Sequence, residues 1–148
     1  MRSGSSAYSA TGAETRISYH IALLAKACEI AGEVEEALSL LDHALEITER
    51  LGERWFAPEL YRYKGQSMLH QGHSNAAEGL YRKALTIADE QEAKLWQLRA
   101  AVSLAQLASD RGRYSEAYGI LAPVYGWFTE GFGTQDLKGA KALLDELS

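Results

Sequence analysis

Apolar residues recur at α-helical spacing along most of this chain, and no stretch alternates apolar and polar residues at the strand period. The first such segment places four residues on one helix face: Ile17, Ile21, Leu24 and Cys28. Gly32 then predicts the end of this helix, because glycine tolerates the left-handed conformation that closes a helix. A second apolar face begins at Val34 and continues to about Leu51. The pattern therefore predicts two helices joined by a short turn.

The same pattern predicts two further hairpins and one final helix. We expect these helices over residues 54–71, 74–90, 93–111, 114–128 and 135–147. Ser74 and Thr134 are the predicted N-cap residues of two of them, since a hydroxyl can accept a hydrogen bond from a free amide of the first turn. Pro123 lies inside one predicted helix and should kink it. The predicted fold class is all-α.

Five columns of residues repeat at intervals of 40 along the chain. The turn residues Gly32, Gly72 and Gly112 form one column, and Ala37, Ala77 and Ala117 form another. The remaining columns are Leu40, Leu80 and Ile120; Leu41, Tyr81 and Leu121; and Ala44, Ala84 and Val124. Self-similarity at this period is typical of stacked helical pairs. We therefore predict a solenoid of three hairpins, with the Ala37 column at the points where paired helices cross closely.

Composition and charge narrow the function classes. The chain has 148 residues and a formal net charge of −5, which argues against general binding of nucleic acid or anionic membranes. The longest apolar run, residues 21–25, is too short to span a bilayer. Cys28 is the single cysteine, so we expect no intramolecular disulfide, an inert buried thiol and a cytoplasmic location. We interpret residues 1–13 as a flexible leader or the remnant of a preceding helix, and residues 14–148 as a single repeat domain.

Five residues of the second hairpin form a motif: Tyr61, Gly65, Met68, Ala77 and Tyr81. On these residues the hairpin resembles the tetratricopeptide repeat. Lys64 departs from the usual leucine, and the 40-residue period exceeds the usual 34. The resemblance therefore implies a tetratricopeptide-like solenoid of three hairpins with lengthened helices, followed by a C-terminal capping helix. HEAT-type helical pairs remain an alternative at this repeat length.

The C-terminal segment carries a second motif. It consists of residues 121–132, LAPVYGWFTEGF, followed by residues 136–138, DLK, and residues 140–144, AKALL. This segment resembles the C-terminal tail of large bacterial signalling proteins, in which a nucleotidyl cyclase or another effector domain precedes an ATPase module and a long tetratricopeptide-like array. The resemblance implies a fragment or a free-standing relative of such a regulatory tail. Neither the cyclase nor the ATPase motifs lie in this chain, so neither activity is implied for it.

The sequence offers no residue set for catalysis. It contains no phosphate-binding loop, no G-x-S-x-G motif and no H-E-x-x-H motif. His70 and His73 form the closest histidine pair, but Gly72 breaks the helix between them and no further ligand completes a metal shell. Two exposed turn histidines are the simpler interpretation. We therefore expect a protein that is not an enzyme, with no catalytic residue, no cofactor and no metal.

The candidate site follows from the register of the repeats, because the first helix of each hairpin lines the concave groove in tetratricopeptide superhelices. The predicted groove residues are Tyr19, Lys26, Arg62, Tyr63, Gln66, Arg99, Ser103 and Gln106, with Glu59 and Asp110 beside them. Lys26, Arg62 and Arg99 would form a cationic line suited to a peptide or polar ligand. The alternative is a solvated helix face with local ion pairs such as Glu59–Arg62. We interpret Trp55 and Trp96 as inward residues of the inter-repeat core rather than ligand platforms.

These observations favour a non-catalytic interaction or regulatory scaffold. We expect its groove to bind a peptide, a protein partner or other domains of its own parent protein, and we expect no nucleic acid or membrane partner. A small-molecule sensor domain of an ATPase-linked regulator is the alternative, which a compact, aromatic-lined pocket would favour. Tyr19, Leu23 and Ile30 would lack the cover of a preceding hairpin, which predicts a homodimer formed through the N-terminal hairpin.

Overall fold

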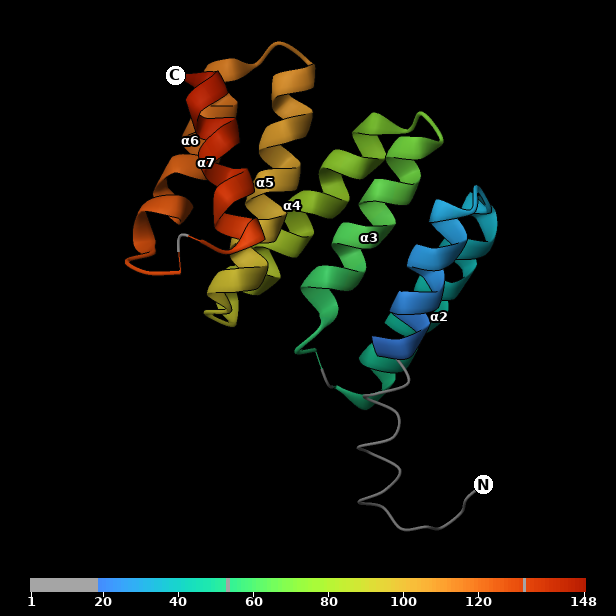
Figure 1. Ribbon diagram of the computed structural model, residues 1–148. Coiled ribbons are helices and arrows are strands. Elements are labelled where there is room, and N and C mark those ends of the chain that lie inside the picture. The colour runs from blue at the N-terminus through green and yellow to red at the C-terminus, as the bar shows by residue number, and fades with distance from the viewer. Residues whose placement is uncertain (1–18, 53, 132) are drawn as a thin grey trace.

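The computed structural model describes residues 19–52, 54–131 and 133–148, and within these residues the chain forms helices and short turns without β-strands. A first helix occupies residues 19–30 and is called helix 19–30 below. It is followed by α2 (Val34–Leu51), α3 (Ala57–His70), α4 (Ser74–Glu90), α5 (Lys94–Asp110), α6 (Tyr114–Trp127) and α7 (Gln135–Leu147). The all-α prediction is confirmed (Figure 1). The predicted leader, residues 1–13, and Ile17 lie outside the described residues.

The helix ends agree closely with the apolar pattern, and α2 and α4 have the expected limits. The Thr134 hydroxyl caps α7 by accepting a hydrogen bond from the Leu137 amide at 3.4 Å, as predicted. The prediction for Ser74 is wrong. Ser74 is the first helical residue of α4, and His73 precedes it without a side-chain capping bond. Pro123 lies inside α6.

The repeated glycines close the first helix of each hairpin. Gly32, Gly72 and Gly112 have φ angles of +89°, +86° and +78°, in the left-handed region that glycine adopts without strain. The amide after each glycine donates to a carbonyl five residues earlier, as in the bond of 2.8 Å from Glu33 N to Cys28 O. This bond satisfies one of the carbonyls that a helix end leaves free. The glycine that repeats every forty residues therefore forms the same turn in all three hairpins.

The repeated small residues lie at the points of closest helix packing. Ala37, Ala77 and Ala117 are completely buried. The second hairpin has a further close approach, because a Cβ atom added to Gly65 of α3 would lie 2.6 Å from Cε1 of Tyr81 on α4. The equivalent positions in the other hairpins are occupied by Ala25 and Ala105, both buried. Glycine at position 65 thus makes room for a ring that the other two hairpins lack.

The prediction that Trp55 faces inward is wrong. Trp55 lies in the turn before α3 and is 47% exposed, because α3 begins at Ala57 and not at residue 54. Phe56 is buried in its place, with its ring 5.3 Å from Tyr19 and 5.7 Å from Trp96. Trp96 packs partly buried against the core, as expected, and its Nε1 donates to the Trp55 carbonyl at 3.1 Å. A side chain of the third hairpin therefore hydrogen-bonds to the backbone just before the second.

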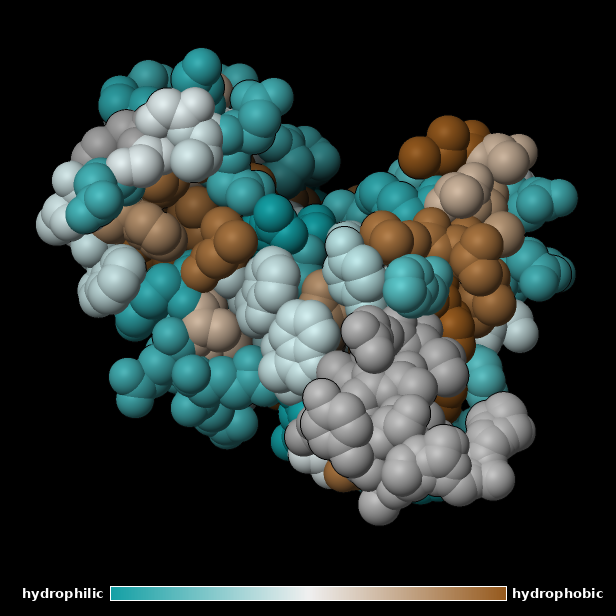
Figure 2. Space-filling view, turned by 60° about the horizontal axis from the view of Figure 1, so that its bottom comes forward, coloured by the Kyte–Doolittle hydropathy of each residue, from teal (hydrophilic) through white to brown (hydrophobic). Residues whose placement is uncertain are grey.

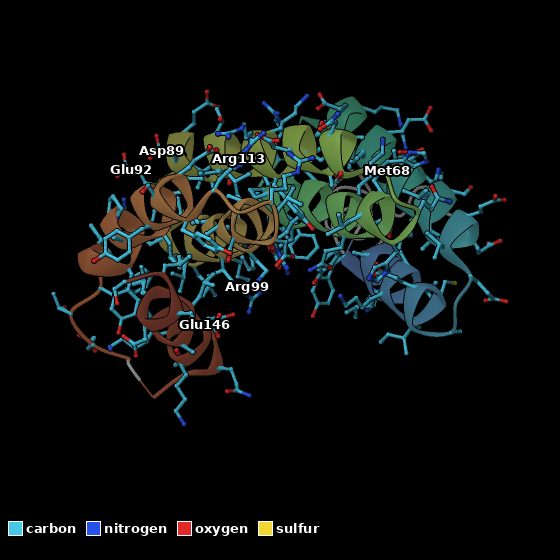
Figure 3. The ribbon with its side chains drawn as sticks, turned by 90° about the horizontal axis from the view of Figure 1, so that it is seen from above. Met68, Asp89, Glu92, Arg99, Arg113 and Glu146 are labelled. Atoms are coloured by element: carbon cyan, nitrogen blue, oxygen red, sulfur yellow. The ribbon has the colours of Figure 1, made fainter. Side chains whose placement is uncertain are left out.

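Viewed from above, roughly down the helix axes, the helices form an arch (Figure 3). Helix 19–30, α3 and α5 make its inner layer, and α2, α4 and α6 make its outer layer. The last helix, α7, packs on α5 and α6 and buries apolar side chains there. These buried residues are Leu137, Ala140, Leu143 and Leu144. The prediction of a C-terminal capping helix is confirmed, and the arch is closed at that end by a polar outer face.

Candidate ligand-binding groove

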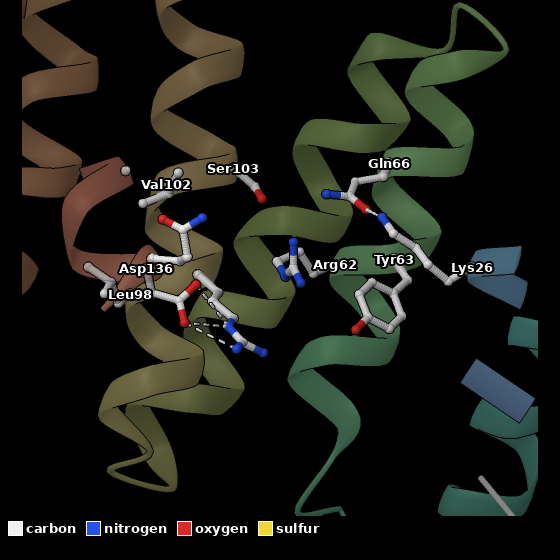
Figure 4. A pocket seen from close by; sticks show the side chains of 11 residues that line it. Lys26, Arg62, Tyr63, Gln66, Leu98, Val102, Ser103 and Asp136 are labelled. Carbon is white, nitrogen blue, oxygen red and sulfur yellow. Dashed lines mark hydrogen bonds and ion pairs between the residues drawn. The ribbon is translucent and has the colours of Figure 1, made fainter. Parts of the chain in front are cut away.

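The inner face of the arch is hollowed between helix 19–30, α3, α5 and α7 (Figure 4). One hollow has a volume of about 490 Å³, and a second of about 370 Å³ shares Lys26, Gln66, Val102 and Ser103 with it. Together they form one continuous groove. Seven of the eight residues predicted for the groove line it: Lys26, Arg62, Tyr63, Gln66, Arg99, Ser103 and Gln106. Tyr19 lines neither hollow, because its ring packs on Phe56.

Residues forty apart meet across this groove. Lys26 Nζ donates to Gln66 Oε1 at 3.0 Å, and Arg99 Nη1 donates to Glu59 Oε1 at 2.9 Å. The members of each pair occupy equivalent positions in successive first helices, which lie side by side in the stack. The sequence period therefore brings chemically different side chains of neighbouring repeats within bonding distance.

Glu59 is a buried carboxylate that anchors two of the three groove cations. Its side chain is 1% exposed and accepts hydrogen bonds of 2.8 and 2.9 Å from Nε and Nη2 of Arg62. The bond from Arg99 adds a second guanidinium. Burial opposes the charge on Arg62, but the hydrogen bonds and charge of Glu59 outweigh it and raise the pKa of the guanidinium. A buried charge needs such partners, since an unpaired carboxylate would lose its hydration without compensation.

The predicted line of cations is therefore a line of ion pairs. Lys26 Nζ lies 3.8 Å from Glu29, whose side chain is 5% exposed. Arg99 also meets Asp136 of α7, with Nε 3.2 Å from both carboxylate oxygens and Nη2 3.1 Å from Oδ2. The local ion pairing that the sequence left as the alternative is present. Each of the three groove cations therefore lies beside a carboxylate of the same protein.

Asp136 was missed by sequence analysis. It belongs to α7, which is not part of the forty-residue repeat, so no column placed it beside Arg99. The available signal was a carboxylate in the first turn of a capping helix, a position that the helix dipole favours in any protein. Only the docking of α7 on α5 shows that this carboxylate reaches the groove.

Tyr63 lies between the cations and keeps a proton to donate. Its ring centroid is 5.4 Å from Lys26 Nζ and 5.0 Å from the guanidinium carbon of Arg62. Burial, together with the charge of Glu59, raises the pKa of the Tyr63 hydroxyl. With the amide of Gln66 and the hydroxyl of Ser103, the groove presents several donors to a ligand rich in hydrogen-bond acceptors.

A sequence profile of the tetratricopeptide repeat matches residues 14–90, slightly more than half of the chain. The chain belongs to the tetratricopeptide repeat family. Repeats of this family generally mediate protein–protein interactions and are typically scaffolds without catalytic activity. The sequence has no significant match to any curated protein.

Among the described residues of this tetratricopeptide repeat protein, the side chains that sequence analysis considered for metal binding or nucleophilic chemistry lie apart from one another or are unreactive. Within the described ranges no group of three or more His, Cys, Asp or Glu side chains is placed to hold a metal ion. His70 Nδ1 lies 2.8 Å from Glu29 at the side of the groove, whereas His73 lies in the turn before α4. Desolvation, with Glu33 and Glu36, raises the pKa of the partly buried Cys28 thiol, which disfavours a reactive thiolate. Among the same residues, no helix combines the length and apolar character needed to cross a membrane.

Proposed function

We propose that this tetratricopeptide repeat domain is a non-catalytic interaction module that binds an extended, acidic peptide or protein segment in its groove. The observation that carries the proposal is the continuous hollow along three successive inner helices, lined by the side chains that the repeat register selects. Donors from Lys26, Tyr63, Gln66 and Ser103 face it. An extended backbone offers carbonyl acceptors along its whole length, and acidic side chains add charge-assisted bonds to the arginines.

The groove suits a chain better than a compact small molecule. Its two hollows share four lining residues, and the aromatic side chains that line them are Tyr63, Tyr81 and His70. A small-molecule sensor is the second candidate, because a volume of about 490 Å³ lies in the range of drug-sized ligand sites. Such a sensor would be expected to enclose its ligand, whereas a peptide groove leaves both ends open.

A screen of random peptides tests the binding function. Ser103→Trp would place a large ring in both hollows, and Ser39→Trp on the exposed face of α2 makes the same exchange away from the groove. We expect enriched peptides to be acidic, to bind wild type and Ser39→Trp equally, and to bind Ser103→Trp at least tenfold more weakly. Peptides that bind Ser103→Trp as tightly as wild type would place recognition elsewhere on the domain.

We further propose that residues 14–148 act as one repeat domain of a bacterial cytoplasmic signalling protein. The support is the resemblance of residues 121–144 to the tails of cyclase- and ATPase-containing regulators. In that setting the groove ligand is an effector domain of the same parent protein. The full-length gene and its neighbours decide the matter, since an isolated short gene among unrelated genes would contradict this parentage.

A second copy of the chain is the partner we propose for the N-terminal face. Leu23, Leu24 and Ile30 of helix 19–30 are 46%, 58% and 79% exposed, and apolar side chains gather over this helix (Figure 2). A two-fold dimer would cover both copies of such a patch. We expect wild type to dimerise at high micromolar concentration in sedimentation experiments and Leu23→Glu to remain monomeric. A monomeric wild type at that concentration would contradict the dimer.

A further inference from the structure

Arg99 is shared by two carboxylates that differ in their surroundings. Glu59 binds Nη1 from inside the domain, with its side chain 1% exposed. Asp136 binds the opposite edge of the guanidinium, formed by Nε and Nη2, from the rim of the hollow, and its side chain is 32% exposed. Figure 4 shows Asp136 on one side of the hollow, Lys26 and Gln66 on the other, and Arg62 between them.

The inner carboxylate cannot be exchanged for a ligand, whereas the outer one can. Glu59 is enclosed and receives bonds from two guanidinium groups, so its displacement would leave a charge buried without partners. Asp136 lines the hollow itself. The Nε–Nη2 edge that it occupies is one of the paired-donor edges on which a guanidinium binds a carboxylate through two parallel bonds. An incoming carboxylate would need that same edge.

The position of α7 does not depend on the Asp136 carboxylate. Leu137, Leu143 and Leu144 are buried against α5 and α6, and Thr134 caps the helix. The Asp136 side chain can therefore leave Arg99 by rotation while the helix backbone stays docked. An exchange of carboxylates on Arg99 requires no unfolding.

We propose that Asp136 is an internal occupant of the position in which the groove binds a ligand carboxylate, so that α7 and the ligand compete for Arg99. This inference rests on the proposed function and adds to it the ligand chemistry and a means of setting affinity. For a partly exposed ion pair such as Arg99–Asp136, the paired state is favoured over the separated state by roughly 1.5- to 5-fold. An internal competitor of that strength weakens ligand binding by roughly 2.5- to 6-fold, and its removal should restore that factor.

The test compares Asp136→Asn with Asp145→Asn. Asp145 lies on the same helix and pairs with Lys141 at 2.7 Å, with both side chains exposed and outside the groove. Each variant removes one negative charge, so a general electrostatic effect on an acidic probe appears equally in both. The probes are fluorescein-labelled hexaglutamate and hexaglutamine at low ionic strength, followed by anisotropy. We expect only Asp136→Asn to bind hexaglutamate about 2.5- to 6-fold more tightly than wild type, and no variant to change hexaglutamine binding.

Each alternative outcome has a definite meaning. Equal hexaglutamate affinity of wild type and Asp136→Asn overturns the competition and leaves the binding groove standing. Hexaglutamate binding by neither protein overturns the competition and the acidic-ligand function together. The Arg99 Nε–Hε resonance should move when hexaglutamate binds wild type, and binding without that shift also overturns the proposal. Asp136→Ser, which also removes the carboxylate and keeps a small polar side chain, should repeat the gain if the asparagine variant folds poorly.

Discussion

The contact between Gly65 and Tyr81 predicts a specific coupling between two hairpin positions. An alanine at position 65 would place its Cβ atom 2.6 Å from Cε1, 2.8 Å from Cδ1 and 3.3 Å from Cζ of Tyr81. Tyr81 is 2% exposed and packs with Ala77, Leu104 and Leu107, so its ring can move away from Gly65 only by repacking these contacts beside the second hollow. Gly65→Ala should therefore strain the packing of α3 on α4.

The magnitude follows from two opposing effects. Overpacking of a filled core costs about 1–3 kcal/mol. Replacement of glycine by alanine within a helix offsets about 1 kcal/mol of that cost. We expect Gly65→Ala to lower the free energy of unfolding by about 0–2 kcal/mol, whereas an alanine at an unobstructed helix position would raise it. In the other hairpins the same columns combine Ala25 with Leu41 and Ala105 with Leu121. Adding Tyr81→Leu should thus relieve the strain, with a coupling of about 1–2 kcal/mol between the two substitutions.

Urea unfolding followed by circular dichroism measures this coupling in wild type, both single variants and the double variant. Gly79→Ala is the matched control, because Gly79 also lies in a helix and an added Cβ there meets nothing within 4 Å. The control should gain about 0.5–1 kcal/mol. Single effects that add within about 0.5 kcal/mol would refute the steric reasoning. A Gly65→Ala variant as stable as Gly79→Ala would show that the ring moves freely.

Three further predictions concern titration, ion pairing and the cap. Burial raises the pKa of Tyr81 to about 12, and tyrosine is uncharged when protonated. The stability that the buried, protonated Tyr81 contributes is therefore complete below the unfolded pKa of about 10 and is lost, by up to about 3 kcal/mol, as pH rises toward 12. The midpoint of urea unfolding should fall between pH 9 and pH 11, and it should fall less for Tyr81→Phe than for wild type. The double variant Arg62→Ala, Arg99→Ala leaves Glu59 buried without its two partners and should lose about 3–5 kcal/mol; adding Glu59→Leu should recover part of this loss, and a double variant as stable as wild type would contradict the pairing. Truncation after Gly131 removes three buried leucines of α7, each contributing about 1.5–3 kcal/mol; the melting temperature should fall, and an unchanged value would show that α7 is not needed as a cap.

The repeat period accounts for what the sequence could predict. Gly32 and Gly72 mark helix ends because few other residues adopt their backbone angles, so those boundaries depend on local chemistry alone. The groove residues of α3 and α5 follow from the same register. Lys26, Gln66 and Gln106 all line the groove because equivalent positions of stacked helices face the same side.

The features that the forty-residue period could not predict depend on contacts between elements that are distant in the sequence. Trp55 and Phe56 are adjacent aromatic residues, and either could fill an inward position by composition. The rings of Tyr19 and Trp96, from neighbouring repeats, enclose Phe56 and leave Trp55 exposed. Asp136 lies outside the repeat altogether, so its place beside Arg99 is a property of the docked cap.

The hydrogen bonds between residues forty apart limit which hairpins can be deleted, inserted or exchanged in this chain. Glu59 with Arg99, and Lys26 with Gln66, occupy equivalent positions in successive hairpins, yet each pair joins a donor to an acceptor. Deletion of forty residues spanning α3 would bring the position of Tyr19 next to Arg99 and remove the buried carboxylate. The order of the three hairpins is therefore fixed. The glycine and alanine columns would accept the loss or gain of a whole hairpin unchanged, but the groove would require compensating substitutions.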